Sequence, residues 1–168
     1  GLGNGIDVFV PTNGSLTITH AGDISVDADT ANLDTFSRGA GNGINANLAG
    51  SGAISITHNG NISISRSGPS RGIIDDRETG REIPTGVGIS AATDGVGSTI
   101  SSDISIVSTG DISSVSAKGT DSAGDGINAQ VMDNGSIAIQ HTGNVSGASA
   151  IEARLAGPTS GDLSIEVD

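Results

Sequence analysis

Three histidines are the residues in this sequence best suited to metal binding or proton transfer. His20, His58 and His141 each end a short alternating segment, LTITH, ISITH or IAIQH, and Ser108 ends the matching segment ISIVS. A zinc site needs three or four convergent ligands, and no carboxylate falls in phase with these positions. We therefore expect corner residues whose rings pack and hydrogen-bond within a turn, and we predict neither a metal site nor a cofactor.

The sequence contains carboxylates suited to acid–base chemistry, but no two of them fall side by side on the strands that the internal repeat predicts. The two outward columns of the first strands read Asp7, Asn45, Ser90, Asn128, Glu152 and Phe9, Asn47, Ala92, Gln130, Arg154. Acid–base cleavage of a glycosidic bond requires two carboxyl groups that flank it, and no two neighbours in either column are both acidic. The serines lie in no nucleophile motif. We predict a chain without catalytic residues.

One segment, SRSGPSRGIIDDRETGREIPTG (Ser65–Gly86), has a mixed-charge composition unlike the rest of the chain. It supplies four of the seven basic residues and four acidic ones, namely Arg66, Arg71, Asp75, Asp76, Arg77, Glu78, Arg81 and Glu82. One interpretation is a solvated loop whose ion pairs contribute little stability. The other is a recognition loop, in which these eight side chains are the candidate binding residues.

The elements that would position these residues follow from an internal repeat. Five segments begin with a strand of one type, namely GIDVFV, GINANL, GISAAT, GINAQV and AIEARL. Apolar and polar residues alternate in each segment, so that Ile44, Ala46 and Leu48 share one face. A period of two residues predicts half-buried strands and excludes helices.

The spacing between strands is nearly constant. Ile18 and Ile24 are six residues apart, Ile6 and Ile18 are twelve apart, and the same distances recur in other repeats. Three short strands per repeat bury their apolar faces only if successive coils stack, at about 4.8 Å. The stacking would create the columns Ile6, Ile44, Ile89, Ile127, Ile151; Ile18, Ile56, Ile106, Ile139, Ile165; and Ile24, Ile62, Ile112, Val145.

The predicted fold is therefore all-β, a right-handed parallel β-helix of about five three-strand coils that spans residues 1–168 as one segment. Gly-Asp and Gly-Asn pairs before the third strands suit sharp corners. Large insertions, at about residues 28–42, 66–87 and 116–125, all fall between a third strand and the next first strand. We expect a row of loops along one edge, which in repeat proteins is often the binding face.

The composition of the chain disfavours some classes of binding partner. The net charge of −12 disfavours nucleic acid, because phosphate binding needs clustered Lys and Arg, and it disfavours an anionic membrane surface for the same reason. No apolar run is long enough to cross a bilayer, so we predict no membrane insertion by this segment. The absence of cysteine fits a long extracellular bacterial chain.

The repeated patterns GxGIxA and GSxxITHxGxIS resemble the passenger region of Gram-negative autotransporter proteins. The resemblance implies export to the cell surface at the Gram-negative outer membrane, and a role in adhesion, aggregation or virulence. It also implies that this chain is a segment of a longer passenger.

The sequence favours a non-enzymatic adhesin or stalk segment exposed on the bacterial surface. It would bind a host-cell surface or an extracellular-matrix component, or self-associate between cells, through the loop edge. Two alternatives stay open. One is a carbohydrate-active β-helix enzyme, a polysaccharide lyase or hydrolase, and the other is a purely structural spacer.

Overall fold

The structure is a computed structural model, and it describes residues 4–29, 41–67, 73–76, 81–84, 86–94, 101–116, 124–157 and 161–168. Within these ranges the chain forms strands and no helix. Fourteen of the strands belong to three parallel sheets. No helix long and apolar enough to span a membrane occurs among the described residues.

Each of the first four coils contributes one strand to each sheet, and the fifth contributes a strand to sheets A and B. Sheet A contains β1 (Ile6–Val10), β4 (Ile44–Leu48), β9 (Ile89–Thr93), β12 (Ile127–Val131) and β15 (Ile151–Leu155). Sheet B contains β2 (Leu16–Ala21), β5 (Gly52–Asn59), β10 (Ser102–Thr109), β13 (Ile137–Thr142) and β16 (Leu163–Val167). Sheet C contains β3 (Ile24–Asp29), β6 (Ile62–Ser67), β11 (Ile112–Ser116) and β14 (Val145–Ser146).

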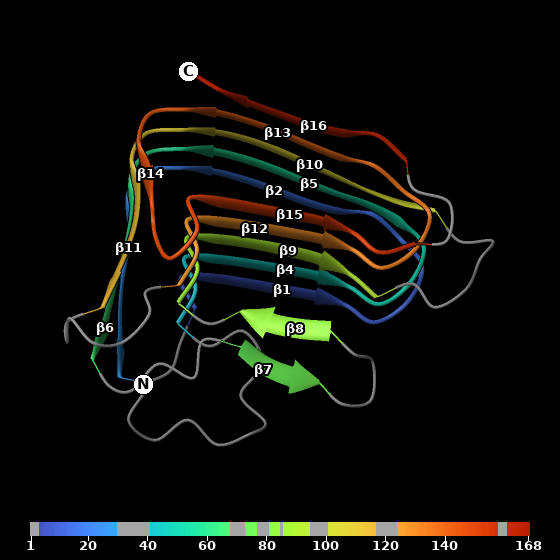
Figure 1. Ribbon diagram of the computed structural model, residues 1–168, viewed down its shortest axis with the longest axis horizontal. Coiled ribbons are helices and arrows are strands. Elements are labelled where there is room, and N and C mark those ends of the chain that lie inside the picture. The colour runs from blue at the N-terminus through green and yellow to red at the C-terminus, as the bar shows by residue number, and fades with distance from the viewer. Residues whose placement is uncertain are drawn as a thin grey trace.

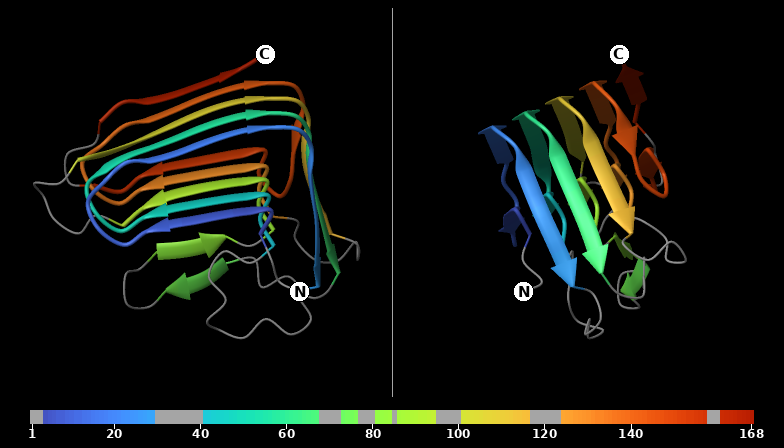
Figure 2. Two further views of the ribbon diagram at one scale, coloured as in Figure 1. Left: turned by 180° about the vertical axis from the view of Figure 1, so that it is seen from behind. Right: turned by 90° about the vertical axis from the view of Figure 1, so that its left-hand side faces the viewer.

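The three sheets surround one core. In Figure 1 sheet B lies above sheet A, and sheet C closes the left side. The chain runs to the right along sheet A, back to the left along sheet B and down sheet C. Successive coils advance toward the viewer of Figure 1, as the right-hand view of Figure 2 shows from the side. This sense is right-handed, the sense that crossover connections between parallel strands almost always take.

The predicted columns are confirmed by the strand register. Ile6, Ile44, Ile89, Ile127 and Ile151 are aligned across sheet A. Ile18, Ile56, Ile106, Ile139 and Ile165 are aligned across sheet B, and Ile24, Ile62, Ile112 and Val145 across sheet C. The core is aliphatic, and most of its fully buried large side chains are isoleucines. β-Branched side chains of this kind pack well on the face of a pleated strand.

Glycine is required at the corner between sheets B and C. Gly60 and Gly110 have φ angles of 148° and 107°, which disfavour other residues. A Cβ atom on Gly60 would collide with the carbonyl oxygen of Gly22, and one on Gly110 with that of Gly60. The glycine column therefore permits both the turn and the close approach of successive coils.

Three of the four connections between sheets C and A are the longest in the chain. Residues 30–43 separate β3 from β4, residues 68–88 separate β6 from β9, and residues 117–126 separate β11 from β12. A further lengthening occurs at the corner between sheets A and B, where residues 94–101 join β9 to β10. This connection was not among the predicted insertions, although the interval from Ile89 to Ile106 departs from the twelve residues between Ile6 and Ile18.

Candidate functional site

The mixed-charge insertion contains a β-hairpin. Strands β7 (Ile73–Asp76) and β8 (Arg81–Pro84) pair antiparallel, with Asp75 opposite Glu82 and Asp76 opposite Arg81. Figures 1 and 2 show the hairpin outside the coils, on the outer side of sheet A. The hairpin thus brings four of the eight candidate binding residues onto one two-stranded element.

The structure describes one of the other four candidates. Arg66 lies in β6, in register with Ala28 and Ser116 of the neighbouring coils. Arg71, Arg77 and Glu78 fall outside the described residues. At this candidate site the structure therefore describes the register of the hairpin and of β6.

The outer face of sheet A is buried in coils two to four. Asn45, Ser90, Asn128 and Gln130 point away from the core, yet each is at most 5% exposed. This corrects the expectation of half-buried strands, which holds for sheet B but fails here. Alternation shows which face of a strand points outward, but it carries no information about a chain segment folded onto that face.

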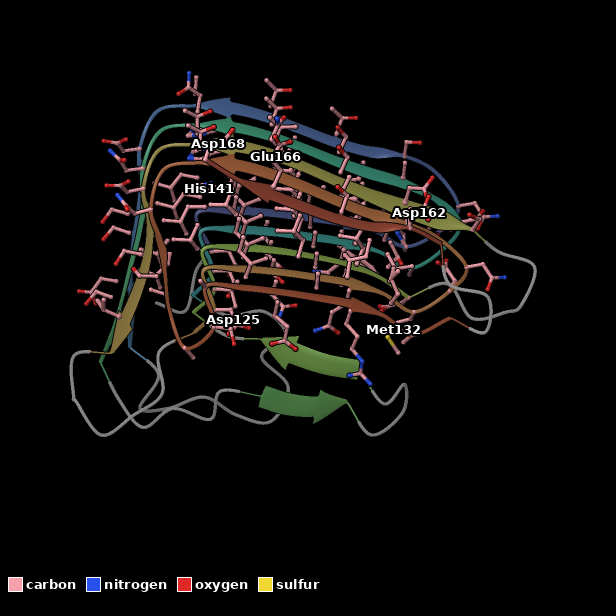
Figure 3. The ribbon with its side chains drawn as sticks, turned by 45° about the horizontal axis from the view of Figure 1, so that its top comes forward. Asp125, Met132, His141, Asp162, Glu166 and Asp168 are labelled. Carbon is pink, nitrogen blue, oxygen red and sulfur yellow. The ribbon has the colours of Figure 1, made fainter. Side chains whose placement is uncertain are left out.

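An amide network runs along this buried face. The Gln130 side-chain NH₂ donates to Asn128 Oδ1 at 3.0 Å, and the Asn128 NH₂ donates to Asp125 Oδ2 at 3.0 Å. Asp125 Oδ1 accepts a hydrogen bond from the backbone N–H of Ser149 at 3.1 Å. Figure 3 shows Asp125 beside sheet A, on the side of the hairpin. Gln130 Oε1 is buried and has no hydrogen-bond partner in the described part of the chain.

The histidines occupy the corner between sheets B and C, as predicted. The rings of His20 and His58 are stacked, with centroids 5.2 Å apart, and their Nδ1 atoms are 3.2 Å apart. His141, labelled in Figure 3, has its Nδ1 atom 2.7 Å from the Ser108 hydroxyl oxygen. The column is therefore a hydrogen-bonded corner that pairs its members two by two.

Burial lowers the pKa values of His58 and His141. Desolvation lowers the pKa of His58, the charge of His20 lowers it further, and the Gly60 backbone and Asp23 oppose both effects. Desolvation also lowers the pKa of His141, against the Asn144 and Gly143 backbone and Asp111. Both rings are therefore held toward the neutral form. Among the described residues, no three or more His, Cys, Asp or Glu side chains are grouped so that they could hold a metal ion.

A buried carboxyl group lies near the corner between sheets A and B. The Ser102 hydroxyl donates to Asp133 Oδ2 at 2.5 Å and lies 3.3 Å from the Gly50 carbonyl oxygen. A serine hydroxyl has one hydrogen, so the short contact to Asp133 is the principal hydrogen bond. Desolvation raises the pKa of Asp133 and nearby Asp103 raises it further, against the hydrogen bond from Ser102.

Side-chain oxygens at the corners accept hydrogen bonds from the next coil. At the corner between sheets B and C, Asp23, Asn61 and Asp111 each accept from the backbone N–H of the equivalent residue one coil on, at 2.7–3.0 Å. The last of these bonds, from the Asn144 backbone, holds the pKa of Asp111 below its ordinary value. Sequence reasoning assigned these Gly-Asx pairs to backbone conformation alone. The sequence did carry a signal for this ladder, because each pair directly precedes the third-strand residue that lies six positions after an isoleucine of sheet B.

None of the protein-family models, curated proteins or solved structures compared with this chain matches it.

Proposed function

We propose that this chain is a non-enzymatic adhesin or stalk segment of an exported bacterial surface protein of the autotransporter type. The coils provide a stiff support, because every strand of a sheet pairs in register with the next coil. The insertions between sheets C and A provide the contact edge. The observation that carries the proposal is that three long connections, residues 30–43, 68–88 and 117–126, all leave the stack at the corner between sheets C and A.

The distribution of charge supports a role for this edge. Residues 28–42, 66–87 and 116–125 hold six of the seven basic residues and eight of the nineteen acidic ones. The rest of the chain holds eleven acidic residues and a single basic one, Arg154. An acidic partner would be repelled by the coils and would meet its least unfavourable surface at the insertions. Acidic groups on a host-cell surface or matrix component, or on a neighbouring bacterium, fit this pattern.

Charge reversals test the proposal without removing the insertion. Arg71→Glu, Arg77→Glu and Arg81→Glu each change the net charge by the same amount as Arg154→Glu, which lies in β15 of the coil stack. Beads coated with each folded variant would be scored for attachment to cultured epithelial cells and for bead–bead aggregation. We expect the three insertion variants to lose attachment or aggregation and Arg154→Glu to keep it.

The same assay separates the alternatives. Equal losses in all four variants would show a general charge effect and refute recognition by the insertion edge. Absence of attachment and aggregation in the unmodified chain would favour the spacer. Release of sugars from an acidic polysaccharide by the purified chain would favour the carbohydrate-active enzyme.

A further inference from the structure

Asn–Gly dipeptides recur at the corners of this fold. The sequence contains five, Asn4–Gly5, Asn13–Gly14, Asn42–Gly43, Asn59–Gly60 and Asn134–Gly135. Asparagine is chemically labile, and a following glycine leaves the next backbone nitrogen unhindered because it has no Cβ. In deamidation that nitrogen attacks the asparagine Cγ, and the side-chain nitrogen leaves as ammonia with the glycine N–H proton. Water then opens the cyclic imide to aspartate or isoaspartate.

The attacking nitrogen is held to a similar degree in four of these pairs. The N–H groups of Gly5, Gly14, Gly43 and Gly60 each donate to a carbonyl oxygen of the next coil at 2.9 Å. Each attack therefore requires that one hydrogen bond between coils open first. This bond slows deamidation at all four pairs alike, so it does not make one pair react faster than another.

The asparagine side chains differ between the pairs. Asn4, Asn13 and Asn42 each use Oδ1 to accept a hydrogen bond from a backbone N–H of the next coil, at 2.9, 3.0 and 2.9 Å. Asn42 is also fully buried, and its NH₂ group lies 3.5 Å from Asn45 Oδ1. A carbonyl held in this way must break its hydrogen bond before its carbon can turn toward the glycine nitrogen.

Asn59 lacks this restraint. It is the last residue of β5, it is exposed, and its side chain has no hydrogen bond to any other described residue. Its amide can rotate while the backbone stays in place. The bond from the Gly60 N–H to the Thr109 carbonyl oxygen, which the other pairs also have, holds the attacking nitrogen.

We propose that Asn59 is a site of spontaneous deamidation in the folded protein, whereas Asn42 is protected by the stacking of the coils. The product places a carboxylate beside His58, at a corner that already carries Asp23 and Asp111. The isoaspartate form also lengthens the backbone where Gly60 pairs with the next coil. The modification would therefore loosen the contact between the second and third coils.

Peptide mapping by mass spectrometry tests this proposal. The intact folded chain is incubated in mildly alkaline buffer at physiological temperature, and conversion at Asn4, Asn13, Asn42 and Asn59 is followed with time. We expect Asn59 to convert at least about tenfold faster than Asn42, the factor that corresponds to about 1.4 kcal/mol for the extra bonds Asn42 must break. In urea the four sites should convert at similar rates, because in the unfolded chain the rate of deamidation depends on the Asn–Gly dipeptide alone.

Two controls make the result decisive. Asn59→Ser should remove the fast signal and leave the slow sites unchanged. Conversion of Asn42 or Asn4 in the folded chain at the rate of Asn59 would overturn the proposal, as would protection of Asn59 to the same degree as Asn42.

Discussion

Thr93 places a hydroxyl group in the aliphatic core. It lies on the inward face of β9 and is aligned with Leu48 of β4 and Val131 of β12. Its side chain is 0% exposed, and Oγ1 has no hydrogen-bond partner in the part of the chain that the structure describes. We expect Thr93→Val to stabilise the protein, because valine replaces the hydroxyl by a methyl group of similar size.

The magnitude follows from the desolvation of the hydroxyl. A buried polar group without a partner costs about 1–3 kcal/mol relative to its hydrated state. The new methyl group removes further apolar surface from water, and the Leu48 and Val131 neighbours already provide an apolar site for it. The free energy of unfolding should rise by about 1–3 kcal/mol, and Tm by roughly 2–4 °C for each kcal/mol in a chain of this size.

Thr57→Val is the matched control, because it is the same change on an outward position of sheet B. Thr57 is exposed, and in the next coil its place is taken by Val107, which is 41% exposed. The general preference of valine for strands acts in both variants, so the difference between them isolates the buried hydroxyl. Urea unfolding followed by circular dichroism measures both, and the control should stay within about 0.5 kcal/mol. A destabilised Thr93→Val variant would show that the hydroxyl has a partner or that β9 faces the other way.

Two further predictions concern the core and the histidine corner. Ile56→Ala should lower the free energy of unfolding by about 2–5 kcal/mol and Ser55→Ala by no more than about 0.5 kcal/mol in the same urea experiment; equal effects would contradict the assigned faces. Because the pKa of His58 is lowered on folding, the unfolded chain binds more protons, so stability should be full well above a pH of about 6.5 and fall as the pH drops through that value. His58→Gln should flatten this dependence in urea titrations at a series of pH values, and an unchanged pH profile would refute the assignment.

The sequence predicted the register of the sheets because one signal specifies it repeatedly. A slip of one residue would turn Ile56 outward and Ser55 inward, so the alternating pattern in each coil excludes every register but one. The same phase placed His58 correctly at an inward corner, since it continues the alternation of Ile54 and Ile56. Local pattern and tertiary packing agree at these positions.

The candidate site was less predictable, because its surroundings come from distant residues. Gln130 and Asn128 have the alternation of a solvated face, and only the position of another segment makes that face buried. The sequence predicted a loop where β7 and β8 form a hairpin, because charged residues interrupt the apolar alternation of the two short strands. Mixed charge is compatible with either structure, so composition could not decide between them.

The corner hydrogen bonds differ between the two corners that border sheet C. Between sheets B and C the ladder through Asp23, Asn61 and Asp111 is continuous, and no insertion interrupts that corner. Between sheets C and A the equivalent ladder passes from Asn42 to the backbone of Val87, whose side chain has no oxygen with which to continue it.

This break immediately follows the longest insertion. The isoleucine columns stabilise the stack at every level, but they do not require a particular chain length between strands. The ladder of side-chain oxygens does not require one either. The Asn42 backbone N–H donates to Asn4 Oδ1 directly after the long connection of residues 30–43. The corner between sheets C and A therefore accepts loops of different length because each loop returns to the same stacked column, whether or not the ladder continues.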